Sequence, residues 1–563
     1  MLMFYKETNF RETPIGKIPE DWDVIKFGDV CRFKRGFSYR SNQITKDPTK
    51  TKFITINDFE KEGGLKRDAE KIYIKEDVNV DPGFFLDDGD VLIANTDMSK
   101  GFIIGAPILI EDMNGKLVYS MDLTKLIFSR SKISSKFLFY YLTYEPVRQK
   151  MKAFAQGTNV LHLNHNLVKN MRIPLPPLPE QKAIAHILST VDEAIQKTNE
   201  IIAKTERLKK GLMQELLTKG VNIFALERDR ILKCVRKCLE SRDHEFEIEE
   251  DLNRHLAEYL KNEFPEYDVD VVIEKRELRP DIIVHKRRTD QNLFAIEVRK
   301  DWNVRGIEED IRKLEKVMLS DHHYCEAIFI GFNIKDFDLV FKLSNKVNFV
   351  LVNPEGEIKV KAREREFKDT EIGRIPKEWK VVKLGNIITY KKGKKPATVF
   401  DKEEPDTLPY LTADNLRVGI FTQWAKEEDE VVKVDEDDLF LIWDGFYCGD
   451  SFIGFKGILS STMIKIEPKQ SNLNKRYLYY FLKTRFKVLN SQIAGMYLKH
   501  VSKFVFNSLK IPLAPSLEQQ KIAEILSTVD KRLEVERKRK EKLERIKKAL
   551  MDLLLTGKIR VKI

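Results

Sequence analysis

Two acidic residues, Asp281 and Glu297, stand with fifteen residues between them in a stretch of short apolar runs. Glu297 lies two positions before Arg299, and the two runs read as neighbouring strands. Paired carboxylates of this kind hold Mg²⁺, while a nearby cation positions the water that attacks a phosphate. Glu250, or its neighbour Glu249, on the preceding predicted helix is a candidate for a further carboxylate. The pattern is typical of Mg²⁺-dependent chemistry on phosphodiesters.

The cation that follows Glu297 is an arginine, Arg299. Arginine does not lose its proton and is bulkier than an ammonium group. Lys300 follows, but on a strand its side chain points to the opposite face. Two interpretations stay open. One is a nuclease with Asp281, Glu297, Arg299 and Glu250 as catalytic residues and Mg²⁺ held by Asp281 and Glu297; the other is a similar fold kept for docking or for contact with DNA.

A second chemistry is indicated where cations and aromatic residues surround glycine turns, in the runs Arg32–Arg40 and Tyr390–Lys395. Such groups contact phosphates and reach base edges, although a solvated surface loop is the alternative. Later loops in each half add amide, imidazole and indole groups. The candidate DNA-contacting residues are Arg32, Lys34, Arg35, Arg40, Asn95, Asn159, His162, Lys391, Lys392, Lys394, Trp443, Lys499 and His500.

These runs lie at the same place in two copies of one sequence pattern. Thr13–Gly36 and Thr370–Gly393 share a Gly-x-Ile-Pro-x-x-Trp opening and a final glycine. Short β-branched and aromatic runs follow, then a predicted helix and a proline-rich exit, at Ile173–Pro177 and Ile511–Pro515. This order predicts one mixed α/β domain in each half of the chain.

A long amphipathic helix is predicted after each exit. Pro179–Leu217 and Leu517–Leu555 both contain the run Ile-Leu-Ser-Thr-Val-Asp, and their apolar residues recur every three or four positions. Glu536 and Lys540 interrupt the second apolar stripe. A helix of about forty residues spans ~60 Å and needs a partner along its stripe.

Together these motifs resemble the specificity (S) subunit of type I restriction-modification systems, over roughly residues 8–222 and 363–563. The resemblance implies two target-recognition domains, each reading one half of a split, asymmetric site in double-stranded DNA. It also implies two antiparallel coiled-coil helices that separate the half-sites and dock methyltransferase (M) subunits, with a restriction (R) subunit as a further partner.

The chain has no Asn/Asp-Pro-Pro-Tyr/Phe run and no phosphate-binding G-x-x-x-x-G-K-[ST] loop. We therefore expect S-adenosylmethionine and ATP to act only through partner subunits, and no cofactor to be needed for DNA recognition. Phe224–Val360 departs from the S-subunit pattern. Through Pro280-Asp281…Glu297-x-Arg299 it resembles the core of PD-(D/E)-x-K nucleases, which implies a central α/β domain and Mg²⁺ as its cofactor.

The expected fold class is mixed α/β. Its parts are a target-recognition domain at 1–177, a long helix at 178–222, the nuclease-like insert at 223–360, a second target-recognition domain at 361–515 and a second long helix at 516–563. The net charge of +11 suits a polyanionic partner. Five scattered cysteines and the lack of a signal peptide or a long apolar run predict a cytoplasmic protein without a membrane partner. A helix-mediated assembly protein with incidental basic loops is the remaining alternative.

Overall fold

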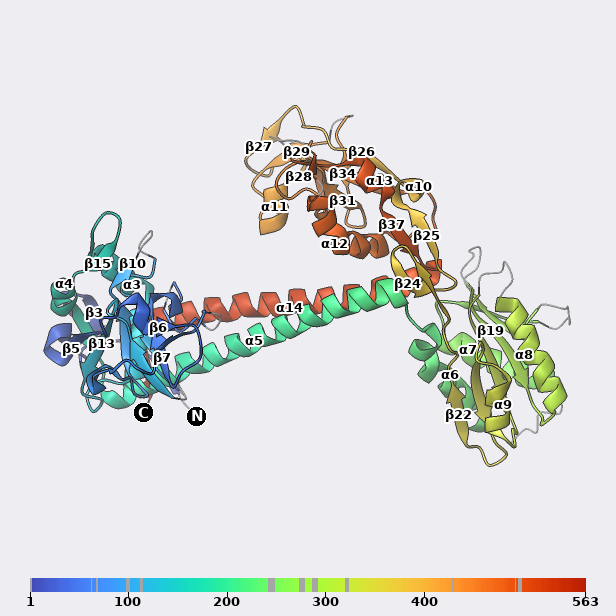
Figure 1. Cartoon of the computed structure of the whole chain (residues 1–563), viewed down its shortest axis with the longest axis horizontal. Helices are drawn as coiled ribbons and strands as arrows, with labels where there is room; N and C mark the ends of the chain where they lie inside the picture. Colours follow the sequence, from blue (N-terminus) through green and yellow to red (C-terminus); the bar gives the residue numbers. More distant parts are fainter. Residues whose placement is uncertain are drawn as a thin grey trace. The chain divides into compact units, whose positions relative to one another are not determined.

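The computed structural model describes residues 3–562 except for 62, 67–68, 98–101, 112–114, 241–248, 273–278, 286–291, 319–323, 428–429, 492 and 495–498. The chain divides into two compact units, Met1–Ala203 with Glu534–Ile563 and Lys204–Leu533 (Figure 1). The first unit holds the first globular domain (residues 1–177) with parts of two long helices. The second holds the remaining parts of those helices, the central domain (223–360) and the second globular domain (361–515).

The first domain contains two four-stranded sheets. The antiparallel sheet has the order β11-β9-β13-β5 (Pro107–Leu109, Val91–Ala94, Leu123–Phe128, Cys31–Arg35). The other sheet has the order β12-β7-β8-β6 (Lys116–Tyr119, Thr51–Ile54, Ile72–Ile74, Ile44–Thr45), with β12 and β7 parallel. Helices α2 (Ser135–Thr143) and α3 (Glu145–Ala153) bury apolar side chains in one core with β9 and β13.

The second domain repeats this arrangement, with one additional strand in its second sheet. Its antiparallel sheet has the order β26-β34-β31-β32 (Ile388–Lys392, Met463–Pro468, Leu439–Ile442, Ser451–Phe452). Its other strands have the order β27-β29-β28-β33-β30 (Val399–Phe400, Trp424–Lys426, Thr407–Leu411, Gly457–Leu459, Lys433–Val434), with β28 and β33 parallel. One helix, α12 (Lys475–Ser491), takes the place of α2 and α3.

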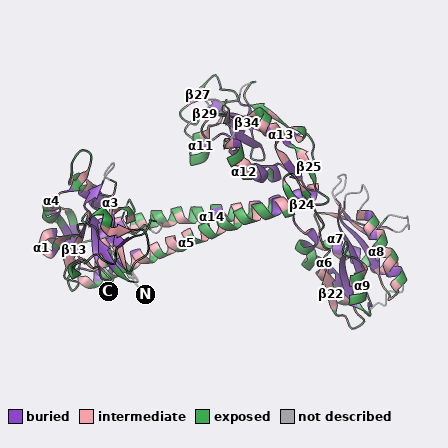
Figure 2. Cartoon of the chain, viewed as in Figure 1, coloured by how far each residue is buried: buried purple, intermediate pink, exposed green. Residues whose placement is uncertain are grey.

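The two predicted long helices are present as α5 (Leu178–Lys219) and α14 (Ser516–Leu555). In the first unit, Ile184 and Leu188 of α5 share a core with Met551 and Leu554 of α14. In the second unit, Leu216 and Leu217 share a core with Ile522 and Leu526. Ion pairs connect the helices in each unit, Asp192 to Lys547 at 2.7 Å and Lys209 to Asp530 at 2.5 Å. The helices therefore pack in opposite directions, and exposed and partly buried residues alternate along both of them (Figure 2).

The second helix ends at Leu555, where its predicted amphipathic stretch ends, and a strand follows it. Helix α14 stops at Leu555, and Gly557 adopts a positive φ of 71°. Residues Ile559–Lys562 then form strand β38, which pairs antiparallel with β1 (Met3–Lys6). Glycine ends a helix readily because it has no Cβ, and the alternating Ile and Val of the last residues favour a strand.

The repeated sequence motifs meet in space, and this contact explains why they occur together. In the first unit, Trp22 of the opening turn donates its indole N–H to Glu180 at the start of α5, at 3.1 Å. In the second unit, Trp379 donates to Glu518 at the start of α14, at 2.8 Å. Each carboxylate is buried and also accepts two hydrogen bonds from an arginine, which is Arg560 for Glu180 and Arg365 for Glu518. The opening turn thus fixes each domain on its helix.

The aspartate of the Ile-Leu-Ser-Thr-Val-Asp run has a parallel role. Asp192 accepts a hydrogen bond from the Tyr140 hydroxyl at 2.9 Å, and Asp530 accepts one from Tyr480 at 2.8 Å. The tyrosines lie on α2 and α12, so these bonds attach each domain to the helix that follows it.

The central domain is a six-stranded mixed sheet in chain order β17 to β22 (Asp268–Val271, Ile282–His285, Asn292–Arg299, Tyr324–Gly331, Asn348–Val352, Ile358–Lys361). Strands β19, β20 and β21 are parallel, and the outer pairs are antiparallel. Helices α6 (Ile223–Glu240) and α7 (Glu249–Glu263) pack on one face, whereas α8 (Val304–Met318) and α9 (Phe337–Leu343) pack on the other. The prediction of an α/β domain here fits this architecture; its nuclease character stays a prediction.

Within the described part of the chain, no helix is both long enough and apolar enough to cross a membrane.

Candidate nucleic-acid interface

Equivalent strands carry the two basic runs. Arg32 and Arg35 are exposed on strand β5, and Lys391 and Lys392 are exposed at the end of strand β26. Lys34 differs from the other predicted contacts. It donates to the Gly83 carbonyl at 2.7 Å and lies over the Phe84 ring at 5.0 Å. Its ammonium group therefore supports the packing of the domain itself, which was not expected from the sequence.

The glycine inside each basic run is required by a close approach of two sheets. A Cβ on Gly36 would overlap the carbonyl oxygens of Ser120 and Tyr119, and a Cβ on Gly393 would overlap those of Ser460 and Leu459. The chain passes from one sheet to the other at this point, since the Phe37 N–H donates to Tyr119 at 2.8 Å. The glycine thus fixes where each basic strand ends.

Gly36→Ala is expected to destabilise the first domain by about 1–3 kcal/mol, because the methyl group can only be accommodated by moving backbone. Gly211→Ala on α5 is the matched control. A Cβ there meets nothing within 4 Å, and alanine favours a helix by up to about 1 kcal/mol over glycine. Thermal unfolding of both variants measures the difference. Equal melting temperatures would contradict the close-approach explanation.

The loops after the central strands occupy the same place in both domains. Thr96 pairs with His162 across strands β10 (Thr96–Asp97) and β15 (Leu161–Leu163). Asp444 pairs with His500 in the matching position of the second domain. The two histidines are thus equivalent in the fold, as their sequence register predicted. Asn159 and His162 are exposed in the first domain, as is Lys499 in the second.

Asn95 is not at the surface, contrary to the expectation that it contacts DNA directly. It is 3% exposed, and its Oδ1 lies 2.9 Å from Nε2 of His165. Burial, followed by the charges of Arg35 and Lys169, lowers the pKa of His165. Lys169 also lies over the Phe33 ring at 5.6 Å. Arg35 and Lys169 are therefore the charged groups that act on His165, whereas the buried Asn95 contacts its ring.

At the position equivalent to Asn95, the second domain has Trp443, and the surroundings are aromatic. Trp443 is half-buried, stacked on Tyr390 with ring centroids 5.5 Å apart and edge-on to Phe506 at 5.4 Å. Beside it Phe446 is 69% exposed, with Lys499 over its ring at 4.8 Å. The two domains thus share a fold but have polar side chains at this position in the first and aromatic side chains in the second.

Phe446 and its neighbours are site residues that the sequence analysis missed. Asn490 of α12 holds the Phe446 backbone by donating to its carbonyl at 3.2 Å. Tyr447 packs against Phe446 with ring centroids 5.0 Å apart and carries Arg417 over its own ring at 3.5 Å. The run Trp443–Tyr447 was a sequence signal for this cluster, because apolar rings in a loop rarely lack a partner.

The remaining predicted cations are at the surface, with acidic neighbours in the second domain. Lys392 pairs with Asp444 at 2.8 Å, and Lys394 pairs with Glu430 at 2.8 Å. Arg40 is exposed in the first domain. Exposed ion pairs contribute little to stability, so these lysines can exchange their carboxylate for a phosphate at small cost.

In the central domain the structure brings Asp281 and Glu297 together. Asp281 Oδ2 accepts a hydrogen bond from the Val298 N–H at 2.9 Å, and Lys313 Nζ of α8 lies 2.6 Å from Glu297 Oε1. Glu297 is 2% exposed. Burial first, and then the charge of Asp281, raises the pKa of Glu297 to about 9. Lys313 is a further residue that the sequence did not indicate, because only the packing of α8 on β19 brings it here.

Two other predicted members of this cluster are engaged elsewhere. Arg299 donates to Asp310 of α8 at 2.6 Å. Glu250 is paired with Arg254, one turn further along α7, at 3.0 Å. Burial alone would lower the pKa of Arg299, but the hydrogen bond and charge of Asp310, followed by the charge of Glu249, raise it. Glu249 therefore affects the pKa of Arg299. Glu250, the predicted catalytic residue, is paired with Arg254 instead.

A duplicated α/β domain with basic and aromatic loops, each copy fixed to one of two packed long helices, defines a DNA-recognition scaffold. The profile of the type I restriction modification DNA specificity domain matches residues 19–207 and 376–545, which together are more than half of the chain. The chain therefore belongs to this family.

The chain is also similar to individual proteins. The chain is 42% identical over 194 residues to the type I restriction enzyme MjaVIII specificity subunit of Methanocaldococcus jannaschii, a match that covers 34% of this chain and 46% of the relative. It is 26% identical over 569 residues to the putative type I restriction enzyme MjaX specificity subunit of the same organism, covering 100% of this chain and 99% of the relative. The crystal structure of the type I restriction-modification S subunit from M. genitalium matches with a TM-score of 0.48 and 14% identity, over 95% of this chain and 96% of that one.

Proposed function

We propose that the two globular domains each read one half of a split, asymmetric sequence in double-stranded DNA, and that α5 and α14 separate the half-sites. The observation that carries this proposal is the repeat of one domain fold with different side chains in equivalent loops. Asn95 contacts His165 in the first copy, whereas Trp443, at the position of Asn95 in the second copy, contacts Phe506. Two copies of one fold with different loop side chains suit two half-sites of different sequence.

Affinity and specificity then come from different groups. Exposed cations such as Arg35 and Lys391 would contact phosphates, which fixes position without reading sequence. The loops with His162 and Phe446 would reach the base edges, where each good base contact gives ~1–3 kcal/mol of discrimination. Several contacts in each half-site supply the ~4–10 kcal/mol that separates specific from non-specific binding.

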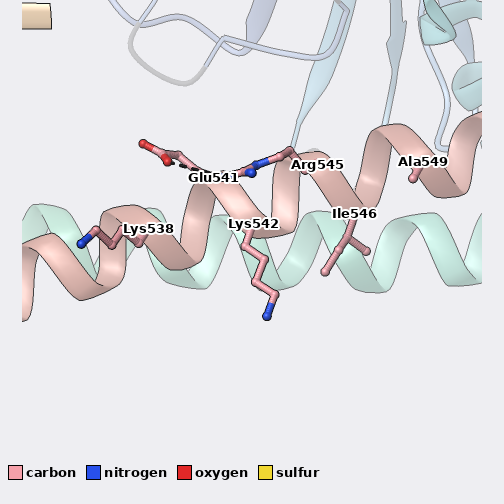
Figure 3. Close-up of a pocket in the computed structure, with 6 residues that line it drawn as sticks. All are labelled: Lys538, Glu541, Lys542, Arg545, Ile546 and Ala549. Carbon is pink, nitrogen blue, oxygen red and sulfur yellow. Dashed lines mark ion pairs between the residues drawn. The ribbon is translucent and has the colours of Figure 1, made fainter. Parts of the chain in front are cut away.

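The long helices also offer a surface for methyltransferase subunits. A shallow groove of about 630 Å³ lies on α14, lined by Lys538, Glu541, Lys542, Arg545, Ile546 and Ala549 (Figure 3). Ile546 is 41% exposed among charged neighbours, which suits a partner with an apolar contact and a polar rim. In this proposal methylation, restriction and the binding of S-adenosylmethionine and ATP belong to the M and R partner subunits.

Selection from random duplex DNA with the purified chain, followed by sequencing of the bound fraction, tests the proposal. We expect two short conserved half-sites with a fixed gap between them. No enrichment, or one continuous motif, would contradict the proposal.

Two matched double variants sharpen this test. Asn159→Ala with His162→Ala should relax preference in one half-site only, and Phe446→Ala with Lys499→Ala should relax it in the other. If both pairs altered the same half-site, the division of labour between the domains would be wrong.

A further inference from the structure

The Phe446 side chain of the second domain is 69% exposed, although the loop that carries it is held firmly. Gly445 has a φ of 108°, a conformation that favours glycine, and its N–H donates to the Lys499 carbonyl at 2.7 Å. The Asn490 amide of α12 donates to the carbonyls of Phe446 at 3.2 Å and Cys448 at 3.1 Å. An apolar ring on a fixed backbone loses little conformational freedom when it binds a partner.

Two cations lie beside this ring. The ammonium group of Lys499 is over the Phe446 ring at 4.8 Å. Tyr447 packs against Phe446, and the Arg417 guanidinium, from α11 (Ala413–Val418), lies over the Tyr447 ring at 3.5 Å. Both cations are exposed, and neither forms an ion pair with the residues that the structure describes. An apolar ring beside unpaired positive charges suits a polyanion that also presents an apolar group, as duplex DNA does.

The surroundings of the ring decide how it can contact DNA. A side chain that inserts between base pairs needs both of its faces free to stack on them. Here Lys499 covers one face of Phe446, and the Tyr447 ring packs against it at an interplanar angle of 88°. The ring is therefore suited to contact base edges in a groove. The apolar group that unmodified DNA presents in its major groove is the thymine 5-methyl, and phenylalanine is one of the side chains that contact it.

We propose that Phe446 contacts the 5-methyl group of a thymine in the major groove of the half-site that the second domain reads, with Lys499 and Arg417 on the neighbouring phosphates. This inference rests on the proposed function, since it names a base that one reading domain requires. The cations bind phosphate at any sequence, whereas the ring favours a methyl group. The preference for thymine at this position therefore depends on Phe446.

The test uses the full chain and the duplex that selection from random DNA enriches, with each thymine replaced in turn by deoxyuridine. This replacement removes the methyl group and keeps base pairing. At one thymine of one half-site, we expect deoxyuridine to weaken binding by the parent about fivefold, the usual effect of losing one buried methyl contact. Phe446→Ala should bind the two duplexes equally, and Phe446→Leu, which keeps an apolar side chain, should retain part of the preference.

Phe504→Ala is the matched control, because Phe504 on α13 (Lys503–Ser508) is 81% exposed in the same domain. It should keep the parental preference for thymine. Unchanged melting temperatures show that the variants are folded, which is expected because both rings are exposed.

Cytosine and 5-methylcytosine at the same position test the methyl group on a second base. The parent should bind the methylated base about fivefold more tightly than cytosine, and Phe446→Ala should bind them equally. Tighter binding of 5-methylcytosine than of thymine would overturn the assignment to thymine.

The outcomes separate this inference from the proposed function. A split motif in which deoxyuridine changes nothing at any thymine would overturn the methyl contact and leave the proposed function standing. So would a Phe446→Ala variant that still prefers thymine, or a Phe504→Ala variant that loses the preference. A selection that enriches no motif would contradict the proposed function, and this inference with it.

Discussion

Glu518→Ala is expected to lower the free energy of unfolding of the second unit by about 3–5 kcal/mol, the cost of leaving a buried charge without its partner. The Glu518 carboxylate is 3% exposed and accepts hydrogen bonds from both Arg365 and Trp379. It also accepts one from the Val221 N–H, at 2.8 Å. Alanine would remove the carboxylate that accepts two hydrogen bonds from the Arg365 guanidinium, which is 12% exposed, and would leave Glu378 at 2.7 Å as its other carboxylate.

The loss should be local. Arg365, Trp379 and Val221 join the opening turn of the second domain and the end of α5 to the start of α14. Differential scanning calorimetry should show an earlier transition for the variant. Hydrogen exchange should show lower protection at Val221 and Trp379 than in the parent, since both amides lie at this junction.

Two comparison variants make this prediction specific. Glu524→Ala removes an exposed carboxylate from the same helix and should change stability by no more than about 0.5 kcal/mol. Trp379→Phe keeps most of the ring but removes one hydrogen bond, and should cost about 1–2 kcal/mol. If Glu518→Ala behaved like Glu524→Ala, the buried cluster would not be what fixes the domain to the helix.

The sequence predicted the duplication, the long helices and the α/β class because each depends on local pattern. Apolar residues every three or four positions define α5 and α14, and repeated turns mark both domains. The contacts between these motifs could not be predicted from the sequence. Trp22 and Glu180 are 158 positions apart, and Arg560 reaches Glu180 from the far end of the chain. Recurrence showed that these residues matter, but only the fold shows that they bind one another.

The candidate sites show the same limit at the level of single side chains. Asn95 follows a strand and is polar, yet it is buried against His165, because the chain continues directly into the short buried strand β10. Lys313 carries no local signal, being one of several charged residues on an amphipathic helix. Its place beside Glu297 depends on how α8 packs on β19, which is a property of the tertiary structure.

Lys391→Ala combined with Lys392→Ala is expected to weaken DNA binding about 100-fold, since each lost charged hydrogen bond costs at least ~1.5 kcal/mol. Both side chains are exposed at the end of β26, beside the loop that carries Trp443. Contacts to phosphate do not read bases, so affinity should fall equally for matched and unmatched sequences. The selected motif should stay the same.

The salt dependence of binding distinguishes a phosphate contact from a general loss of charge. Each phosphate contact contributes about 0.9 to the slope of log K against log salt, so the double variant should flatten the slope by roughly 1.8. Lys380→Ala with Lys383→Ala removes the same charge from exposed positions on β25 (Lys380–Lys383) of the same domain. That control should keep the parental slope.

Asp444 provides a further check on how Lys392 is used. In the free protein Lys392 is paired with Asp444 at 2.8 Å, so binding to phosphate must break this pair. Asp444→Asn removes the competitor and should strengthen binding at all sequences while Lys392 is present, and have a smaller effect once Lys392 is alanine. Additive effects of the two substitutions, or an unchanged salt slope in the double lysine variant, would show that the end of β26 faces away from DNA.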